Sequence, residues 1–382
     1  MSKTLVITND FPPQEGGIET FVIEVLKCFP SQDVVVYTSA AEGAAEYDAA
    51  LPFPVIRDQT KVLLPTKRVT ERAIAIAKEH GCDRVWFGAA APLAFMAKHL
   101  RAAGIKRIVA TSHGHEIWWA RIPGARTALR RIGRDTDVVT FLGEYTRSKI
   151  APGLGKQAFL SRLVPGAHAS DFGKDIDPQV ITDLKDEYGL TGKKVIVCVS
   201  RLVKRKGQDV LIKAMPQILE QIPDAILVIV GRGPYEQDLR KLAAKTSTSV
   251  VITGGVPYDQ LINFYAAADI FAMPTRNRLM GLEAEGLGIV FLEASASRLP
   301  VIAGDSGGAP DAVLEGVTGY VVDGTDVNEV ASKIIDTLND PNAKQMGLAG
   351  RKWVEEEWSW EGSAQRLQRM LDPEVPLSKI DG

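Results

Sequence analysis

The chain has 382 residues, of which 45% are apolar and 24% are charged, and its formal net charge is −2. This length suits two or three ordinary domains, and the composition is typical of a globular protein rather than a disordered or collagen-like one. Because no apolar run approaches the roughly 18 residues of a membrane span and the N-terminal residues lack a signal-peptide pattern, we expect a cytoplasmic protein.

The charge is distributed unevenly along the chain. Residues 1–164 carry 22 Lys and Arg against 16 Asp and Glu, a net +6, whereas the remainder carries −8. This asymmetry indicates that the N-terminal half meets an anionic partner or surface. Cys28, Cys82 and Cys198 form no CxxC pair, so we expect neither a disulfide framework nor a zinc site.

Short apolar runs that alternate with helical stretches occur in two series. The first series comprises residues 4–8, 34–37, 84–87, 107–111 and 137–141. The second comprises residues 195–199, 225–230, 250–252, 269–273, 300–303 and 320–322. Such runs are typical of parallel strands covered on both faces, so we predict an α/β protein with two Rossmann-like, doubly wound domains.

Residues 165–192, rich in Pro, Gly and charge, predict a linker between the two series. We therefore place an N-terminal domain at residues 1–168 and a C-terminal domain at residues 169–357, followed by a Trp-rich segment and terminal helix. Open parallel sheets bind ligands at the carboxyl ends of their strands, so a cleft between the domains is the expected ligand site.

The segment from Met280 to Leu299 carries the most chemistry, because Glu285 and Glu293 flank the start of an apolar helix. The residues of that start are Gly286, Gly288, Ile289 and Val290. A helix start presents unpaired N–H groups and a positive dipole end, which favour a diphosphate, and glycines let it approach closely. Glu293 lies about two turns further on, where it can accept two hydrogen bonds from a ribose diol. The alternative is a helix cap at Glu285 and a solvated Glu293.

Two cations follow the first strand of the second domain in the sequence RLVKRKG. Arg201 can bind a phosphate in bidentate fashion and Lys206 can bind it as a point charge. Both can therefore stabilise the negative charge of a departing diphosphate. A solvated basic loop is the alternative interpretation.

Glu285, seven residues and Glu293 resemble the E-x7-E motif of the retaining glycosyltransferase family 4, whose members have the GT-B fold of two Rossmann-like domains facing a central cleft. The resemblance implies a nucleotide-sugar donor, with Glu285 at the transferred sugar and Glu293 at the ribose. It also implies that Arg201 and Lys206 are the R-x4-K pair of the family. By the same resemblance, residues 358–382 return to complete the N-terminal domain.

Two N-terminal motifs are similar to the same family. Gly16 and Gly17 match its N-terminal GG loop, which lies near the donor phosphates and the acceptor. In the TSHGHE segment, the family histidine that contacts the sugar corresponds to His113, with His115 as the alternative. Residues 275–280 depart from the shorter connection usual in the family, which leaves donor-sugar contacts there open.

Residues 118–134, WWARIPGARTALRRIGR, combine aromatic and basic side chains. The membrane or acceptor candidates in this segment are Trp118, Trp119, Arg126, Arg130 and Arg131. Basic faces with aromatic residues suit an anionic membrane surface, and an ordinary surface helix is the alternative. Together with the net +6 of the N-terminal half, the segment suggests a peripheral protein that acts on an anionic lipid headgroup.

The FPPQEGGIETFV, TSHGHE and EGLGIVFLEASA segments together resemble the actinobacterial GDP-mannose-dependent phosphatidylinositol mannoside mannosyltransferases, particularly those that add the second mannose. This resemblance implies GDP-mannose as donor, a phosphatidylinositol mannoside as acceptor, an α-1,6 bond and the inner face of the plasma membrane. We expect no cofactor, no metal and no nucleic-acid partner. The alternatives are a family 4 enzyme that uses a UDP- or ADP-sugar and a soluble acceptor, and a non-enzymatic nucleotide-sugar-binding protein.

Three other signals are weaker. The sequence GDSGG around Ser306 reads like the nucleophile motif of trypsin-like proteases, but it follows an apolar strand of an α/β chain, where a glycine turn fits better. No G-x4-GK[ST] sequence supports a P-loop nucleotidase, and Gly231-Arg-Gly233 lacks the third glycine of a dinucleotide fingerprint.

We therefore predict a retaining hexosyl transfer. Arg201, Lys206 and the helix start would stabilise the departing diphosphate. No side chain is placed as a protein nucleophile, so we expect same-face transfer in which the leaving phosphate accepts the proton of the acceptor hydroxyl.

Overall fold

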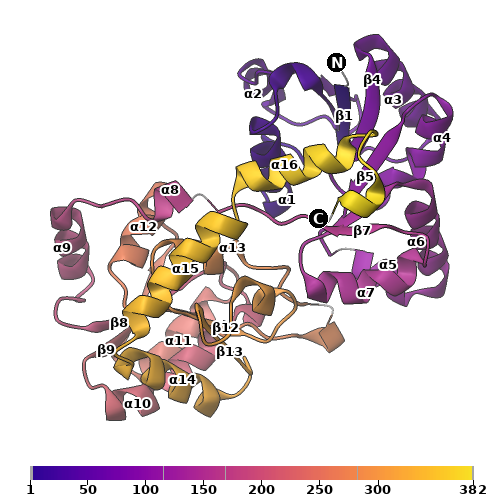
Figure 1. Cartoon of the computed structure of the whole chain (residues 1–382). Coiled ribbons are helices and arrows are strands. Elements are labelled where there is room, and N and C mark those ends of the chain that lie inside the picture. Colours follow the sequence, from indigo (N-terminus) through magenta and orange to yellow (C-terminus); the bar gives the residue numbers. More distant parts are fainter. Residues whose placement is uncertain (1–2, 115, 168, 282, 381–382) are drawn as a thin grey trace. The chain divides into compact units, whose positions relative to one another are not determined.

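The computed structural model describes residues 3–114, 116–167, 169–281 and 283–380. The chain divides into two compact units (Figure 1). Unit 1 comprises Met1–Gly166 and Trp360–Gly382, and unit 2 comprises Ala167–Ser359. The breaks between the units lie two residues from the bounds that the sequence suggests at 168 and 358.

Unit 1 contains, within the described residues, a seven-stranded parallel sheet in the order β3-β2-β1-β4-β5-β6-β7. Its strands are β1 (Lys3–Thr8), β2 (Val34–Thr38), β3 (Val55–Arg57), β4 (Cys82–Phe87), β5 (Arg107–Thr111), β6 (Val138–Phe141) and β7 (Leu160–Arg162). Strands β2 and β5 are buried at every position, because helices cover both faces of a parallel sheet and β-branched side chains fill the space.

Two apolar clusters cover the faces of this sheet. The helices of unit 1 are α1 (Gly17–Lys27), α2 (Ala44–Ala49), α3 (Lys67–His80), α4 (Ala97–Ala102), α5 (Glu116–Arg121), α6 (Pro123–Asp135), α7 (Glu144–Leu154) and α16 (Trp360–Leu371). One face packs against α1 and α16, and the other packs against α3, α4, α6 and α7.

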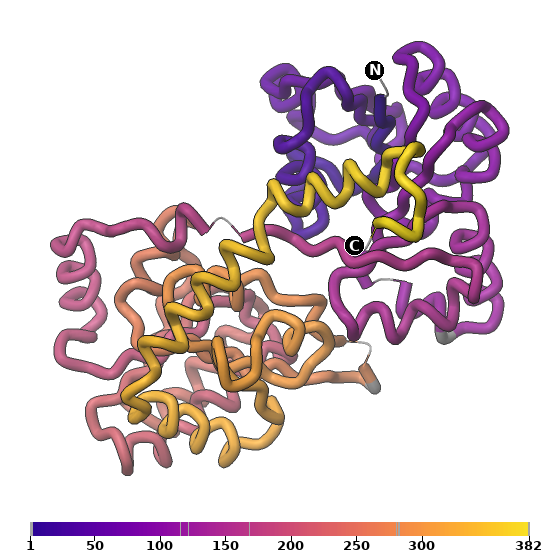
Figure 2. Tube along the Cα trace, in the orientation of Figure 1, coloured from indigo at the N-terminus to yellow at the C-terminus, as the bar shows by residue number. Residues whose placement is uncertain are grey.

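The last helix, α16, belongs to the same unit as the N-terminus. In Figures 1 and 2 it is the yellow segment that lies along the indigo helix α1. Trp360 at its start is buried, and a side chain at Gly166 would strike the Trp360 ring. Ser363 Oγ donates to the carbonyl of Val164 at 2.7 Å, which ties the helix to the chain that leaves β7.

Unit 2 contains, within the described residues, a six-stranded parallel sheet in the order β10-β9-β8-β11-β12-β13. Its strands are β8 (Lys194–Val199), β9 (Ala225–Val230), β10 (Val250–Gly254), β11 (Ile270–Met273), β12 (Val301–Gly304) and β13 (Gly319–Val322). Its helices are α8 (Ala169–Phe172), α9 (Pro178–Glu187), α10 (Gln208–Gln221), α11 (Glu236–Thr246), α12 (Tyr258–Ala266), α13 (Ile289–Ala296), α14 (Val327–Asn339) and α15 (Ala343–Glu357). The carboxyl ends of β8 and β11 precede the loops that carry the predicted donor residues of this unit.

The segment predicted as a linker, residues 165–192, contains the helices α8 and α9. Asp177 caps α9, because its side chain accepts a hydrogen bond from the backbone N–H of Gln179 at 2.9 Å. Pro178 occupies the first helical position, where the N–H that proline lacks has no partner within the helix. Among the residues that the structure describes, none of the helices is long and apolar enough to cross a bilayer.

Candidate functional site

The helix start predicted between the two glutamates is present in unit 2. Helix α13 begins at Ile289, and Gly288 precedes it with φ 86°, a left-handed conformation that favours glycine. A side chain at Gly288 would lie 2.7 Å from the Phe291 ring. In the described part of the chain no side chain caps this helix, so its first N–H groups remain suited to an anion.

Glu285 is held in a buried ion pair. Lys206 Nζ lies 2.7 Å from Glu285 Oε2, and Arg205 Nε lies 4.0 Å from the same oxygen. Glu285 is 7% exposed and Lys206 is 8% exposed. Because the loss of one partner would leave an uncompensated buried charge, each residue depends on the other. Two residues 79 positions apart, both predicted as site residues, therefore lie together.

The GDSGG segment supports the loop of Glu285. The backbone N–H of Glu285 donates to Ser306 Oγ at 3.1 Å, and Ser306 Oγ donates to Asn277 Oδ1 at 3.0 Å. The N–H of Gly308 donates to the carbonyl of Glu285 at 2.9 Å. A side chain at Gly307, which has φ 59°, would strike that carbonyl. Ser306 is buried and serves a glycine turn, as its sequence context suggests.

Glu293, on α13, is only 5% exposed and meets two tyrosine hydroxyls from α12. Tyr265 Oη donates to Oε2 at 2.9 Å, and Tyr258 Oη donates to Oε1 at 3.4 Å. Burial raises the pKa of Glu293 to about 7, and the two hydrogen bonds oppose this rise. Burial also raises the pKa of Tyr265 well above its usual range, so this hydroxyl keeps its proton.

A pocket of about 590 Å³ lies at the carboxyl ends of β8 and β9 and beside the start of α13. Its lining residues are Val199, Ser200, Arg201, Val230, Gly231, Arg232, Gly255, Val256, Pro257, Leu261 and Val290. Arg201 is exposed, and its carbonyl accepts Gln208 Nε2 at 3.2 Å, which anchors the backbone and leaves the guanidinium at the pocket. Val290 and Glu293 are three residues apart on α13 and so share a face of the helix.

The connection at residues 275–280 is tied down by ion pairs. Arg276 binds Asp209 of α10 in bidentate fashion, at 2.7 and 3.2 Å. Arg278 pairs with Glu283 at 2.6 Å and with its backbone in an antiparallel bridge. These contacts tie Arg276 to α10 and Arg278 to Glu283, two residues before Glu285.

In unit 1, His113 lies just beyond β5. Its Nε2 is 2.8 Å from the carbonyl of Gly88, and because a carbonyl only accepts, Nε2 carries the proton. Phe21 of α1 meets the imidazole edge to face at 5.1 Å. Gly16 and Gly17 are exposed at the start of α1. The alternative histidine, His115, lies outside the described residues.

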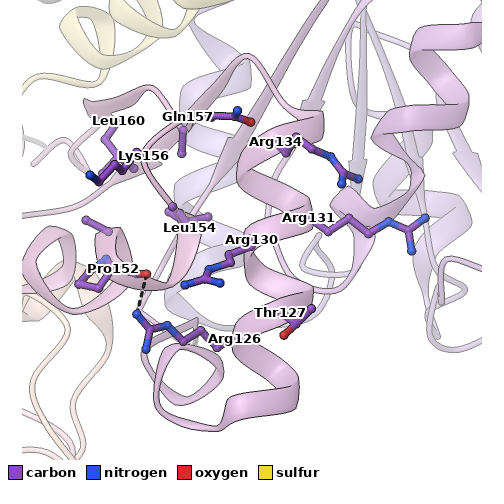
Figure 3. Close-up of a pocket in the computed structure, with 13 residues that line it drawn as sticks. Arg126, Thr127, Arg130, Arg131, Arg134, Pro152, Leu154, Lys156, Gln157 and Leu160 are labelled. Carbon is purple, nitrogen blue, oxygen red and sulfur yellow. Dashed lines mark hydrogen bonds between the residues drawn. The ribbon is translucent and has the colours of Figure 1, made fainter.

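The basic segment forms one wall of a groove of about 930 Å³ between α6 and the end of α7 (Figure 3). Arg126 and Arg130 of α6 point toward the Pro152 side, and Arg126 donates to the Pro152 carbonyl at 3.2 Å. Arg131 extends to the other side of α6 and lies 3.7 Å from Asp135. Lys156 lies across the groove.

The two tryptophans of the basic segment differ. Trp118 is exposed on α5. The Trp119 ring packs against Phe95, with ring centroids 6.0 Å apart, and against the core of unit 1. Trp119 therefore has a packing role, whereas Trp118 remains available to a surface.

Two family models match the chain in succession. The model described as "Glycosyltransferase Family 4" matches residues 15–165, and the model described as "Glycosyl transferases group 1" matches residues 180–353. Over 377 residues the chain is 47% identical to the GDP-mannose-dependent alpha-(1-6)-phosphatidylinositol monomannoside mannosyltransferase of Mycolicibacterium smegmatis, and the match covers 96% of this chain and 97% of that relative. The chain belongs to the family 4 glycosyltransferases.

A second member of the family is similar over nearly the same span. The chain is 46% identical over 376 residues to the GDP-mannose-dependent monoacylated alpha-(1-6)-phosphatidylinositol monomannoside mannosyltransferase of Corynebacterium glutamicum, with 97% of this chain and 98% of the relative covered. The family resemblance predicted from the E-x7-E motif is confirmed. The roles of individual site residues stay predictions.

Solved structures share the fold. Anabaena HepE in complex with UDP matches with a TM-score of 0.79 at 19% identity, covering 97% of this chain and 99% of that chain. A glycosyltransferase from Rickettsia africae also matches with a TM-score of 0.79 at 19% identity, covering 97% and 98%. The fold is therefore GT-B, as predicted.

Several residues of the candidate site escaped the sequence motifs. Arg205 approaches Glu285, and Tyr258 and Tyr265 bind Glu293. The two tyrosines are seven residues apart, and this spacing places both on one face of a helix. The spacing is the sequence signal that could have indicated a shared partner. No group of three or more His, Cys, Asp or Glu side chains suited to a metal ion occurs among the described residues.

Proposed function

We propose that the chain transfers mannose from GDP-mannose to the inositol of a phosphatidylinositol mannoside and forms an α-1,6 bond with retention. The observation that carries this proposal is the 46–47% identity, over nearly the whole chain, to relatives of that name. The geometry of unit 2 supports it, because a pocket, a cation and two carboxylates lie around one helix start.

The donor would bind along the start of α13. Glu293 would accept the ribose hydroxyls, Arg201 and Lys206 would contact the diphosphate, and Glu285 would contact the mannose. The N–H groups at Ile289 and Val290, freed by the turn at Gly288, would add the positive end of the helix to the phosphate site.

The proposed chemistry needs no protein nucleophile. The bond between the anomeric carbon and the donor phosphate oxygen breaks while the bond to the acceptor oxygen forms on the same face. The acceptor proton passes to the leaving phosphate, whose charge Arg201, Lys206 and the helix start stabilise. Because protein cations supply this stabilisation, we propose that transfer is independent of metal and persists in excess chelator.

Unit 1 would serve the acceptor. The tautomer of His113 is fixed by Gly88, which prepares the ring to contact a sugar hydroxyl, and the Gly16-Gly17 loop leaves its backbone accessible. The basic groove of α6 and α7, with Trp118 nearby in sequence, would hold the anionic surface in which the lipid acceptor lies. We propose peripheral association with the inner face of the plasma membrane on this basis.

The donor assignment is tested by calorimetry with GDP, UDP and ADP, followed by transfer assays with their sugars. We expect GDP to bind most tightly and GDP-mannose to be the active donor. The Glu293→Gln variant should bind GDP more weakly by about 1.5–3 kcal/mol, because a charge-assisted contact to the diol is lost. Tighter binding of UDP or ADP, or unchanged GDP affinity in the variant, would contradict the assignment.

A further inference from the structure

The two tyrosines that bind Glu293 differ in burial. Phe172 contacts both rings edge to face, at 5.6 Å for Tyr265 and 5.7 Å for Tyr258, but Tyr265 is 0% exposed and also packs against Phe271 at 5.9 Å. Tyr258, at the first position of α12, is 56% exposed. The ring of Tyr265 is therefore fixed by packing, whereas much of the ring of Tyr258 faces solvent.

Their hydrogen bonds differ in the same direction. The bond from Tyr265 to Glu293 Oε2, at 2.9 Å, lies within the usual range for O–H···O contacts, which is about 2.5–3.0 Å. The contact from Tyr258 to Oε1, at 3.4 Å, exceeds that range and is correspondingly weak. One oxygen of the carboxylate is thus firmly bound and the other is loosely bound.

Neighbours of both Tyr258 and Glu293 line the pocket at the carboxyl ends of β8 and β9. Pro257, which precedes Tyr258, lines the pocket, as does Leu261 on the same helix. Val290, one turn before Glu293 on α13, also lines it. A ligand in this pocket would therefore lie beside the start of α12, from which the Tyr258 hydroxyl reaches Glu293.

We infer that Tyr265 is a positioning residue that holds the Glu293 carboxylate for the nucleotide ribose, and that the ribose hydroxyls replace the hydroxyl of Tyr258. This inference rests on the proposed role of Glu293 as the ribose contact. A carboxylate contributes most to ligand affinity when its orientation is already fixed, because fixing the side chain during binding costs part of the interaction energy. Tyr265 removes that cost, because its hydroxyl remains a donor at every working pH.

The test compares GDP with 2′,3′-dideoxy-GDP, which lacks both ribose hydroxyls, in calorimetric titrations of the full chain. The wild-type protein should prefer GDP. Tyr265→Phe should reduce this preference about tenfold, which corresponds to one hydrogen bond to a charged group, and should leave the affinity for dideoxy-GDP unchanged. Tyr258→Phe, the same chemical change on the same helix, should leave the preference intact or increase it.

The outcomes separate the two levels of the proposal. If the wild-type protein does not distinguish the two nucleotides, the ribose assignment of Glu293 fails. If it distinguishes them and Tyr265→Phe does so equally well, only the positioning role fails. Equal weakening of both nucleotides by Tyr265→Phe, or an equal loss of preference in Tyr258→Phe, would also overturn the inference, because either result indicates a general structural effect.

The pH dependence gives an independent readout. Glu293 must be ionised to accept both hydroxyls, so the preference for GDP should fall as the pH decreases through about 7. The titratable groups that act on Glu293 are Tyr258 and Tyr265, and the neighbouring Cys198 of β8 has a pKa raised to about 12 by burial. The midpoint should move to higher pH in Tyr265→Phe, because the lost hydrogen bond favoured the charged carboxylate. An unchanged midpoint would contradict the positioning role.

Discussion

The charged site of unit 2 and the basic groove of unit 1 are built in opposite ways. In unit 2, Glu285, Lys206 and Glu293 are each less than a tenth exposed, and each has a partner at hydrogen-bonding distance. In the groove, Arg130 and Lys156 are exposed and form no ion pair in the described part of the chain. Buried, paired groups fix the geometry of a small ligand, whereas exposed cations provide salt-dependent attraction to a surface. Substitutions should therefore affect chemistry in one region and surface binding in the other.

The largest effect should come from Lys206. In Lys206→Ala the transfer rate should fall by roughly 100- to 1,000-fold, because the cation that we propose contacts the departing diphosphate is lost. The neighbouring Lys204→Ala is the matched control, since Lys204 is exposed and lies over the Tyr235 ring. Comparable activity in the two variants would contradict the role of Lys206.

The same substitution should also destabilise unit 2, by about 3–5 kcal/mol, since Glu285 would be left buried without its partner. The double variant Lys206→Met with Glu285→Gln should recover most of this stability in denaturant unfolding and remain inactive. Recovery of activity together with stability would mean that the pair is structural only.

Ionisation of the buried Glu293 carboxyl should lower the unfolding free energy of the ligand-free protein as the pH rises. Its pKa is about 7 in the fold against a usual 4.5, so its stabilising contribution is complete below pH 4.5 and is lost as the pH rises through 7. The Gln side chain of Glu293→Gln does not ionise. The unfolding free energy of this variant, relative to that of the wild-type protein, should therefore rise from near zero at pH 4.5 to about 3 kcal/mol at pH 8. Denaturant unfolding at both pH values measures this difference, and a constant difference would contradict the buried carboxylate.

Replacing Ser306, which supports the loop of Glu285 in unit 2, should have a smaller effect. Ser306→Ala removes the acceptor for the Glu285 N–H and the donor to Asn277, which should cost about 1–3 kcal/mol of stability and lower kcat several-fold. Transfer activity that remains in Ser306→Ala would show that Ser306 supports the loop and does not act as a nucleophile. Complete loss of activity with unchanged stability would contradict it.

The basic groove should give the smallest effect per residue. Arg130→Glu with Lys156→Glu should weaken binding to vesicles that contain anionic lipid by about 1 kcal/mol or more per reversed charge, and less so at high salt. Lys241→Glu with Lys245→Glu, at two exposed positions on α11 of unit 2, is the control of equal charge change. Vesicle flotation with no preference for anionic lipid, or an equal effect of the control, would refute this surface.

Local pattern predicted much of the fold. Strand β9 is a continuous apolar run and β5 has an apolar centre, and their predicted bounds, 225–230 and 107–111, match the structure. The edge strands β3 and β7 were missed because they are short and half-buried, so tertiary pairing defines them more than their own composition does. The helices α8 and α9 were missed because their sequences are as polar as a linker.

The site was predictable where a motif carried the chemistry and not where long-range packing did. The helix start at Ile289 follows from two glycines and an apolar run, which local sequence reveals. The pairing of Glu285 with Lys206, and of Glu293 with Tyr265, joins separate loops and helices, which only the packing of β8, α12 and α13 brings together. The seven-residue spacing of Tyr258 and Tyr265 indicates a shared helix face, but no spacing indicates that Glu293 is the residue this face meets.

The most direct test of mannose transfer is the structure of the product. Purified protein, GDP-mannose and phosphatidylinositol monomannoside would be incubated, and the new glycosidic bond would be analysed by NMR spectroscopy. We expect one mannose added in the α configuration to the 6-hydroxyl of inositol, in excess chelator as well as without it. A β linkage, attachment at another hydroxyl, or no transfer from GDP-mannose while another nucleotide sugar is consumed would contradict the proposal.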